Sequence, residues 1–172
     1  MVYKEILPTT SNTVSTGVFS ARGAANIHAS ASEVWAAVMD LANYPAWNLY
    51  TPSVTPPSGQ KSVAAGDMCA EKFRFNTTAT LESIPIMIIS RSDEEMTICW
   101  RGCYKNIPVW ALCPEKVQKV TRINNEESKF EVWETQSGPL AHIAKWYVGS
   151  KLDGMNQGIA DCLKKYVEGK RI

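Results

Sequence analysis

The sequence predicts an α+β domain in which antiparallel strands precede a long C-terminal helix. Three observations carry this prediction. A helix-start signal follows an apolar segment near residue 30, the middle of the chain alternates apolar and polar residues, and the last part has one apolar stripe at helical spacing. Because strands and helices are segregated in this order, the final helix is expected to pack on one sheet face. The 172 residues suffice for one domain with a substantial core.

Three parts are expected along the chain. Residues 1–17, rich in Thr and Ser from position 9 onward, are predicted to form a loose lead-in. The domain itself is expected to span residues 18–168 and to begin with a strand at 18–27, where apolar and small residues dominate. Residues 169–172 are expected to be a short tail.

The first helix is predicted from a capping box, in which Ser30 caps the helix and Glu33 bonds back to the cap. Trp35 lies on the apolar stripe of this helix and is expected in the core. The helix should stop before Tyr44 and Pro45, because the residue before a proline disfavours helical geometry. The proline-marked segment 45–59 is then expected to be a loop.

From residue 67 to residue 136 apolar and polar residues alternate, which is typical of strands in an antiparallel sheet. In the first of these strands Cys69, Glu71, Phe73 and Phe75 share one face, which we take as the inward face. Glu134 continues the apolar face of the last strand. Strands are expected within residues 67–75, 80–90, 96–100, 117–123 and 130–134.

The final helix is predicted over residues 145–168, after a break at Gly138 and Pro139. Its apolar residues recur at spacings of three and four, which places them on one stripe that should face the sheet. The stripe consists of Val148, Leu152, Met155, Ile159, Cys162 and Tyr166.

Composition excludes several classes of function. The net charge of +1 gives no global signature of nucleic-acid binding. Two His and five Cys without a CxxC pair offer no zinc spacing, so we expect no metal, and no dinucleotide, NTPase or GxSxG hydrolase motif is present. The odd cysteine count indicates reduced thiols, and the sequence shows neither a signal peptide nor a run of apolar residues long enough to span a membrane. We therefore expect a soluble, cytoplasmic protein without a cofactor and without stable membrane insertion.

Residues 31–48 carry a compound motif. They read Ala-Ser-Glu-Val-Trp, then an Asp at position 40, then Tyr-Pro-Ala-Trp-Asn. This motif resembles the opening of the SRPBCC (START-like) superfamily, especially its polyketide cyclase/dehydrase branch. Trp-Arg-Gly at 100–102, Ser-Gly-Pro-Leu-Ala at 137–141 and Met-Asn at 155–156 resemble later motifs of that branch, so the likeness covers about residues 18–168. One departure is Lys116 to Val120, where relatives often carry a His followed by alternating aromatics.

The resemblance implies a helix-grip fold, in which a curved antiparallel sheet wraps around the C-terminal helix and leaves a deep apolar cavity. Members of the superfamily bind sterols, lipids, plant hormones, quinones or polyketides, and some catalyse cyclisation or dehydration. The fold therefore does not decide the function, which has to be argued from the site.

Glu71 and Glu134 are the strongest catalytic candidates, because each interrupts an otherwise apolar face. A poorly solvated carboxylate has a raised pKa, which suits a general acid or base. Alternatively each Glu pairs with an arginine, such as Arg74, Arg91 or Arg101, or a bulge reverses the face assignment. His142 is a further candidate base near the cavity entrance; the alternative is a solvated histidine at a helix start.

Substrate-binding candidates come from the aromatic excess of six Trp and from the resemblance. Tyr104 and Trp110 are expected to form a lid, Trp146 to lie at the rim, and Trp47 either to line the cavity mouth or to pack internally. The full set is Trp47, Phe73, Arg91, Trp100, Tyr104, Trp110, Trp146 and Met155.

Two functions remain open from the sequence. The protein is either a cofactor-independent cyclase or dehydratase acting on a hydrophobic polyketide- or terpenoid-like substrate, or a non-catalytic carrier of an apolar ligand. A carrier needs only an apolar wall, whereas proton transfer needs a positioned acid or base.

Overall fold

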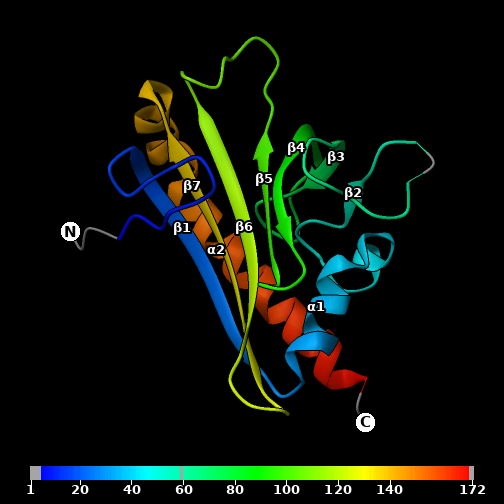
Figure 1. Cartoon of the computed structure of the whole chain (residues 1–172). Coiled ribbons are helices and arrows are strands. Elements are labelled where there is room, and N and C mark those ends of the chain that lie inside the picture. Colours follow the sequence, from blue (N-terminus) through cyan, green and yellow to red (C-terminus); the bar gives the residue numbers. More distant parts are fainter. Residues whose placement is uncertain (1–4, 59, 171–172) are drawn as a thin grey trace.

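One seven-stranded antiparallel sheet organises the computed structural model, which describes residues 5–58 and 60–170 (Figure 1). The sheet order is β1-β7-β6-β5-β4-β3-β2. The elements are β1 (Gly17–Ile27), α1 (Ala31–Met39), the 3-10 helix η1 (Leu41–Ala46), β2 (Ser53–Thr55), β3 (Met68–Phe73), β4 (Glu82–Ser92), β5 (Thr97–Gly102), β6 (Cys113–Arg122), β7 (Ser128–Ser137) and α2 (Pro139–Gly169). The predicted α+β class and the long C-terminal helix are confirmed. Positions 1–4, 59 and 171–172, which belong to the expected lead-in, loop and tail, lie outside the described residues.

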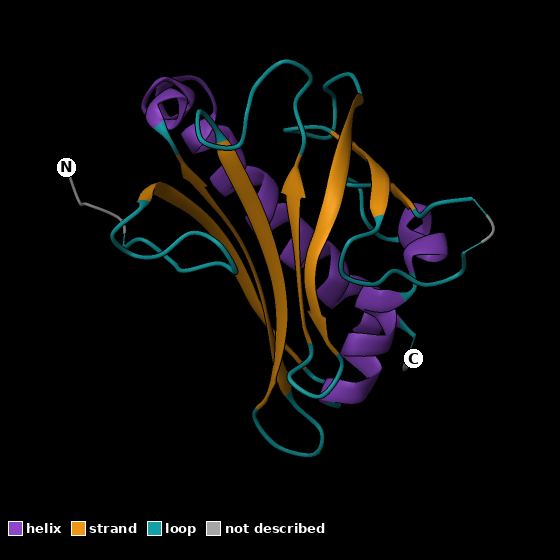
Figure 2. Ribbon diagram, turned by 45° about the horizontal axis from the view of Figure 1, so that its top comes forward, coloured by secondary structure: helices purple, strands orange, loops and turns teal. Residues whose placement is uncertain are grey.

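The sheet is curved, and α2 crosses its inner face along a diagonal (Figure 2). The short helix α1 packs beside the C-terminal half of α2. Apolar side chains from both helices and from the inner face form one core cluster. The largest fully buried apolar side chains are Trp100, Tyr44, Phe130, Ile27, Ile86, Ile88, Ile98, Met155, Ile159 and Leu163.

The capping box at the start of α1 is confirmed. The backbone N–H of Glu33 donates to the Ser30 hydroxyl at 3.3 Å, and the Ser30 N–H donates to the Glu33 carboxylate at 2.9 Å. Beyond Met39 the chain does not become a plain loop, because η1 continues through Pro45. Pro45 has no N–H to donate within this helix, and the chain closes the turn around it through the Trp47 N–H, which donates to the Tyr44 carbonyl at 3.1 Å.

Helix α2 differs from the prediction in its start and in its buried stripe. It begins at Pro139, six residues before the expected Lys145, with the proline in the first turn, where its missing N–H costs nothing. Val148, Cys162 and Tyr166 are only half-buried, and α2 packs against β1 and α1 as well as against the inner sheet face. The buried band is therefore wider than one stripe and comprises Ala141, Leu152, Met155, Asn156, Ile159, Ala160, Leu163 and Val167.

Helix α2 and β1 touch backbone to backbone at Gly23. A Cβ atom at Gly23 would lie 2.2 Å from the carbonyl carbon of Asn156, so only glycine fits there. Side chains of α2 also hydrogen-bond the backbone of β1, which is the edge strand. The Asn156 amide donates to the Ala21 carbonyl at 3.0 Å, and the Gln157 amide both donates to the Ala24 carbonyl at 3.1 Å and accepts from the Ala24 N–H at 3.2 Å. These bonds take the place of a neighbouring strand at an otherwise open edge.

The N-terminal segment expected to be loose is bonded to the outer face of the sheet over residues 7–12. The centre of this contact is Glu115, which is fully buried on that face. Its carboxylate accepts from the Thr9 hydroxyl at 2.6 Å, from the Ser11 N–H at 2.9 Å and from Arg101 Nη2 at 2.7 Å. Thr and Ser bind here through hydroxyl groups, which is why a composition typical of loops does not mean a loose segment.

Burial by itself raises the pKa of Glu115, but the hydrogen bonds from Thr9, Ser11 and Arg101 outweigh burial and hold the pKa below its usual range. The charged carboxylate therefore stabilises the contact between the N-terminal segment and the sheet.

Replacing Gly23 by Ala should destabilise the protein by about 1–3 kcal/mol or more, because the added methyl group forces α2 away from β1. Gly154→Ala is the matched control on α2, since a Cβ there meets nothing within 4 Å. That variant should stabilise by about 0.5–1 kcal/mol through helix propensity. Urea unfolding measures the change in stability of both variants. Equal changes would contradict the close contact between α2 and β1 at Gly23.

Glu115→Gln should lower the free energy of unfolding by about 1.5–3 kcal/mol at neutral pH, because charge-assisted bonds to Arg101 and to residues 9–11 are lost. The loss should shrink on acidification, since stability from a carboxylate with a lowered pKa disappears as the pH falls through that pKa.

Glu131→Gln is the control for this prediction, because Glu131 pairs with Arg22 at a partly exposed position. Its cost should stay below about 1 kcal/mol. Equal costs for the two variants in urea unfolding would show that the N-terminal contact contributes nothing specific.

Candidate functional site

A pocket lies between the inner face of the sheet and α2. Its walls come from β3 to β7, from the connections after β3 and β5, and from the middle of α2. The lining residues are Glu71, Phe73, Phe75, Ile84, Trp100, Gly102, Tyr104, Pro114, Lys116, Glu134, Gln136, Val148, Leu152 and Met155. Most of this wall is apolar, and the polar groups are concentrated on β3, β6 and β7.

The pocket volume is about 70 Å³, whereas pockets for drug-sized ligands usually measure about 300–1,000 Å³. The deep cavity implied by the family resemblance is therefore not open in this structure. The reason is the size of the side chains that meet there, above all Trp100, Tyr104 and the two phenylalanines. Larger hollows of about 360–600 Å³ lie elsewhere, but none of them is lined by a buried carboxylate–lysine pair.

Three buried charged side chains meet in the pocket. Lys116 Nζ lies 3.3 Å from Glu71 Oε1 and 3.9 Å from Glu134 Oε2. The sheet places them: Lys116 on β6 is paired in register with Glu134 on β7, so both point to the inner face. Glu71 comes from β3, on the far side of β5 and β4, and the curvature of the sheet brings it to the same ammonium group.

Neutral side chains complete the hydrogen bonding of the two carboxylates. Gln136, two residues after Glu134 on the same strand, donates to Glu134 Oε1 at 2.7 Å. The Thr51 hydroxyl donates to Glu71 Oε1 at 3.4 Å. The cluster is thus a continuous polar chain within an apolar wall, which is the arrangement that a buried charge requires.

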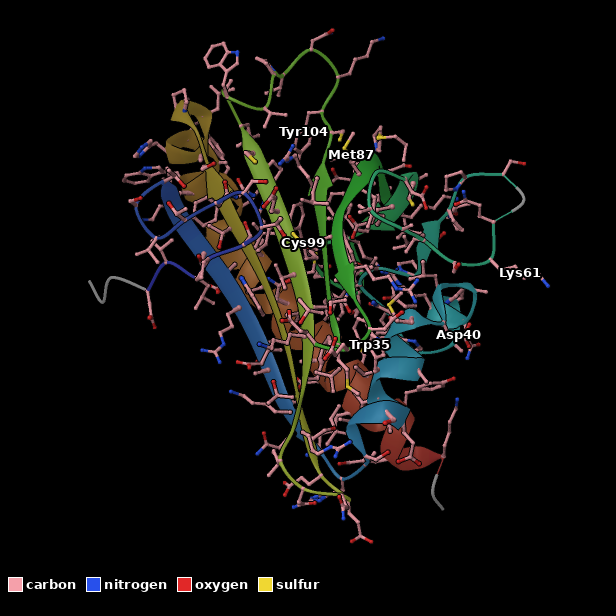
Figure 3. All side chains as sticks on the ribbon, viewed as in Figure 1. Trp35, Asp40, Lys61, Met87, Cys99 and Tyr104 are labelled. Atoms are coloured by element: carbon pink, nitrogen blue, oxygen red, sulfur yellow. The ribbon has the colours of Figure 1, made fainter. Side chains whose placement is uncertain are left out.

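Burial raises the pKa of Glu134, and the nearby charge of Glu71 raises it further, while Lys116 and Gln136 act in the opposite direction. Burial also raises the pKa of Tyr104 to about 12, with added contributions from Glu134, Glu71 and Glu82. Although Tyr104 is 41% exposed as a residue, it lines the pocket. Figure 3 shows Tyr104 towards the upper end of the molecule. At neutral pH its phenol is therefore a hydrogen-bond donor.

Two buried polar atoms of pocket residues have no hydrogen-bond partner among the described residues. They are the indole nitrogen Trp100 Nε1, a donor, and the amide oxygen Gln136 Oε1, an acceptor. An unpaired buried polar atom costs about 1–3 kcal/mol, so both gain if a ligand supplies the missing partner.

Six of the predicted site residues line the pocket: Glu71, Phe73, Trp100, Tyr104, Glu134 and Met155. The inward face assigned to β3 is correct at Cys69 and Glu71, which are buried. Of the two explanations left open for the carboxylates, the arginine pairing does not hold, because both lie against Lys116. Arg101 pairs with Glu115 on the outer face instead.

Five predicted site residues lie away from the pocket. Trp47 is buried against Tyr44 and Tyr166, with ring centroids 4.9 and 6.3 Å apart, so of its two predicted roles the structure shows internal packing. Arg91 binds Asp93 at 2.7 Å and the Val63 carbonyl at 2.8 Å.

The other three, His142, Trp110 and Trp146, are exposed. His142 points to solvent in the first turns of α2. Trp110 is 74% exposed and Trp146 is 89% exposed, so neither covers the pocket as a lid or rim. For His142 and Trp146 the reason is that α2 starts earlier than predicted, so its first turns extend beyond most of the helix residues that line the pocket. Trp110 lies in the β5–β6 connection, which runs outside the pocket wall at this residue.

Lys116 and Gln136 are the polar pocket residues that sequence reasoning missed. The strand carrying Lys116 was predicted to begin at Val117, whereas β6 begins at Cys113. Alternation extended back from Val120 through Gln118 would have placed Lys116 on the inner face. Gln136 had the same signal, since it continues the face of Glu134.

Within the described residues, no group of three or more His, Cys, Asp or Glu side chains is arranged to hold a metal ion. The pocket cluster, with a lysine at its centre, is suited to proton transfer and to binding of a carbonyl or hydroxyl group.

The fold of the chain is similar to that of several proteins of known structure. The START superfamily protein of Mycobacterium smegmatis superposes with a TM-score of 0.60 at 11% identity, covering 86% of this chain and 98% of that one. The chain has the helix-grip fold of the SRPBCC, or START-like, superfamily. No model of a known protein family matches the sequence.

Other proteins of this SRPBCC fold are similar over most of the chain. A norcoclaurine synthase point mutant from Thalictrum flavum, in complex with a transition-state analogue, has a TM-score of 0.62 at 12% identity and covers 89% of this chain and 96% of that one. The di-domain ARO/CYC protein StfQ of the steffimycin biosynthetic pathway has a TM-score of 0.58 at 14% identity over 87% of this chain and 45% of that one. In sequence, the oxopyrrolidines biosynthesis cluster protein O of Penicillium oxalicum is 26% identical over 171 residues, 85% of each chain.

Raising the pH should cost the wild type stability relative to Glu134→Gln. The pKa of Glu134 is higher in the folded protein than its unfolded value of about 4.3. Protonation of Glu134 therefore contributes its whole stabilisation at a pH below the unfolded pKa, and this contribution is lost as the pH rises through the folded pKa. Gln resembles the protonated acid and does not titrate. Urea unfolding from about pH 4 to about pH 8 measures the difference.

Glu131→Gln provides the control of opposite sign. Burial tends to raise the pKa of Glu131, but Lys129 and Arg22 outweigh burial and lower it. The wild type should therefore gain stability relative to this variant as the pH rises from the acid range. A slope of the same sign for both variants would argue against a proton held at Glu134.

Proposed function

We propose that the protein is a cofactor-independent cyclase or dehydratase of small-molecule metabolism that acts on a hydrophobic, polyketide- or terpenoid-like substrate. One observation carries the proposal: two buried carboxylates, Glu71 and Glu134, share Lys116 in an apolar pocket. A carrier of an apolar ligand needs no such group. Burying charged side chains costs free energy, so a carrier would gain nothing from them. A cluster of two carboxyl groups and one lysine can hold a proton and exchange it with a ligand.

The charge balance of the cluster supports proton transfer. Two carboxylates against one ammonium leave one negative charge in excess in a site with little water. A proton on Glu134 removes this excess, which agrees with the direction of its pKa shift. The same carboxyl group can release the proton and take one up, as a general acid or base must.

A cyclisation can be written with the groups present. One carboxylate of the pair removes a proton from the carbon between two carbonyl groups, and the resulting enolate carbon attacks a second carbonyl carbon to form the new C–C bond. The oxygen of that carbonyl becomes an alkoxide and takes up a proton. In a dehydration a second proton is removed from the attacking carbon, its electron pair forms a C=C bond, and the hydroxyl takes up a proton and leaves as water. Lys116, Tyr104 and Trp100 Nε1 are the donors available to the developing negative oxygen.

Binding requires the pocket to widen, because about 70 Å³ is less than a multi-ring substrate occupies. The side chains free to move are at the mouth. Tyr104 belongs to the exposed β5–β6 connection, and Phe75 follows the end of β3. Their displacement opens the pocket without disturbing the strands that hold the cluster.

The comparisons support an enzyme of small-molecule metabolism. The names of the similar proteins include a norcoclaurine synthase, an ARO/CYC protein and a protein of an oxopyrrolidines biosynthesis cluster. A shared fold does not imply a shared reaction, so the proposal is based mainly on the cluster of Glu71, Lys116 and Glu134.

Glu71→Gln and Glu134→Gln should each lower turnover by about 10²–10⁴-fold with little change in ligand affinity, because the shape of the pocket is kept and one carboxylate is lost. Linear polyketone probes incubated with the protein and followed by mass spectrometry measure turnover, and quenching of tryptophan fluorescence measures binding. Glu131→Gln, on the outer face, should retain full activity.

Wild-type turnover in both pocket variants would show that the carboxylates are structural. If the wild type binds the apolar probes tightly and converts none of them, and co-purifies with an unmodified ligand, the protein is a carrier.

A further inference from the structure

Exposed apolar side chains are gathered at one end of the molecule. Most large hydrophobic residues that face solvent in the described structure come from two segments, the β5–β6 connection and the first turns of α2. We call this set the aromatic rim: Tyr104, Val109, Trp110, Leu140, Ile143, Trp146 and Tyr147. Single exposed apolar residues are ordinary, but a set with two Trp and two Tyr gathered on two neighbouring segments marks an interaction surface.

The two segments are joined to each other. The Leu140 N–H donates to the Ala111 carbonyl at 3.0 Å, so the start of α2 is fixed to the end of the β5–β6 connection. Both lie at the upper end of the molecule in Figure 1, opposite the β6–β7 turn. Within the fully described range 139–151, Ala141 is the sole buried residue. These first turns of α2 therefore present most of their surface to solvent, while Ala144 and Val148 are half-buried against the core.

The two segments that carry the aromatic rim contain positive charges and no negative ones. Residues 103–112 and 138–152 contain no Asp or Glu, and they carry the exposed lysines Lys105, Lys145 and Lys151. The Lys151 ammonium lies 5.8 Å from the Phe75 ring, at the edge of the pocket. One carboxylate, Glu82 at the start of β4, is close enough to Tyr104 to raise its pKa and borders the surface.

We propose that the aromatic rim docks the protein peripherally on an anionic lipid bilayer. Trp and Tyr side chains beside Lys are the composition found at the level of lipid headgroups. A protein–protein interface would be expected to be poor in Lys. None of the helices in the described residues combines the length and hydrophobicity needed to cross a bilayer, so the contact is at the membrane surface.

Docking in this way brings the pocket to the membrane. Tyr104 belongs both to the aromatic rim and to the pocket wall, and Val148 lines the pocket one residue after Tyr147. An apolar ligand dissolved in the bilayer then reaches the pocket without crossing water. This inference does not depend on catalysis, since a carrier would use the same route.

Co-sedimentation with phosphatidylcholine vesicles, with and without phosphatidylserine, tests the proposal. The wild type should bind the phosphatidylserine vesicles more tightly, and added salt should weaken that binding. Trp110→Glu and Trp146→Glu should each lower the affinity at least about tenfold, because an apolar anchor becomes a repelled charge. Replacing Lys105, Lys145 and Lys151 by Gln should cost about fivefold for each lysine on phosphatidylserine vesicles and nothing on pure phosphatidylcholine.

Ile123→Glu is the matched control, because Ile123 is an exposed apolar residue in the β6–β7 turn at the opposite end. It should bind vesicles like the wild type, and thermal unfolding should show every variant folded. Absence of wild-type binding to either vesicle, or equal losses in Trp146→Glu and Ile123→Glu, would overturn the proposal. So would sedimentation velocity showing a dimer that Trp146→Glu dissociates, since the rim would then pair with a second copy of the chain.

Discussion

The close contact between α2 and β1 at Gly23 is the constraint on which the rest of the structure depends. A long helix can cross the sheet with its backbone against the edge strand only where no Cβ intervenes. The side chains of Asn156 and Gln157 hydrogen-bond the backbone of that strand. One side of α2 therefore covers the edge of the sheet, while an adjacent side of the helix covers the core. This crossing fixes the position of Leu152 and Met155 over the inner face.

The narrowness of the pocket and its acid–base character have the same physical origin. Because α2 lies so close, the aromatic side chains meet the helix and leave little room for water. Poor solvation raises the pKa of Glu134, which a wider and wetter cavity would not do. The lysine between the two carboxylates makes this burial tolerable, since an isolated charge there would be too costly. A site able to transfer protons thus arises from tight packing combined with one balancing ammonium group.

Two adjacent residues of β6, Glu115 and Lys116, belong to two different charged networks on opposite faces of the sheet. Glu115 points to the outer face, where Arg101 and the N-terminal segment bind it, and Lys116 points inward to Glu71 and Glu134. The period of two keeps the networks on opposite sides of the sheet. The outer network ties the N-terminal segment to the strands that carry the inner one.

The sequence by itself determined the fold class, the capping box and the inward faces of β3 and β7, because these depend on local spacing. It identified Glu71 and Glu134 for the same reason: a carboxylate on an alternating apolar face is visible within one strand. Only the tertiary structure decided that both acids share Lys116, because that meeting depends on strand order and sheet curvature rather than on spacing. It also decided the volume of the pocket and the exposure of Trp110 and Trp146. These follow from how far α2 extends past the sheet and how closely it packs, and no periodicity within a single segment encodes the distance between two segments.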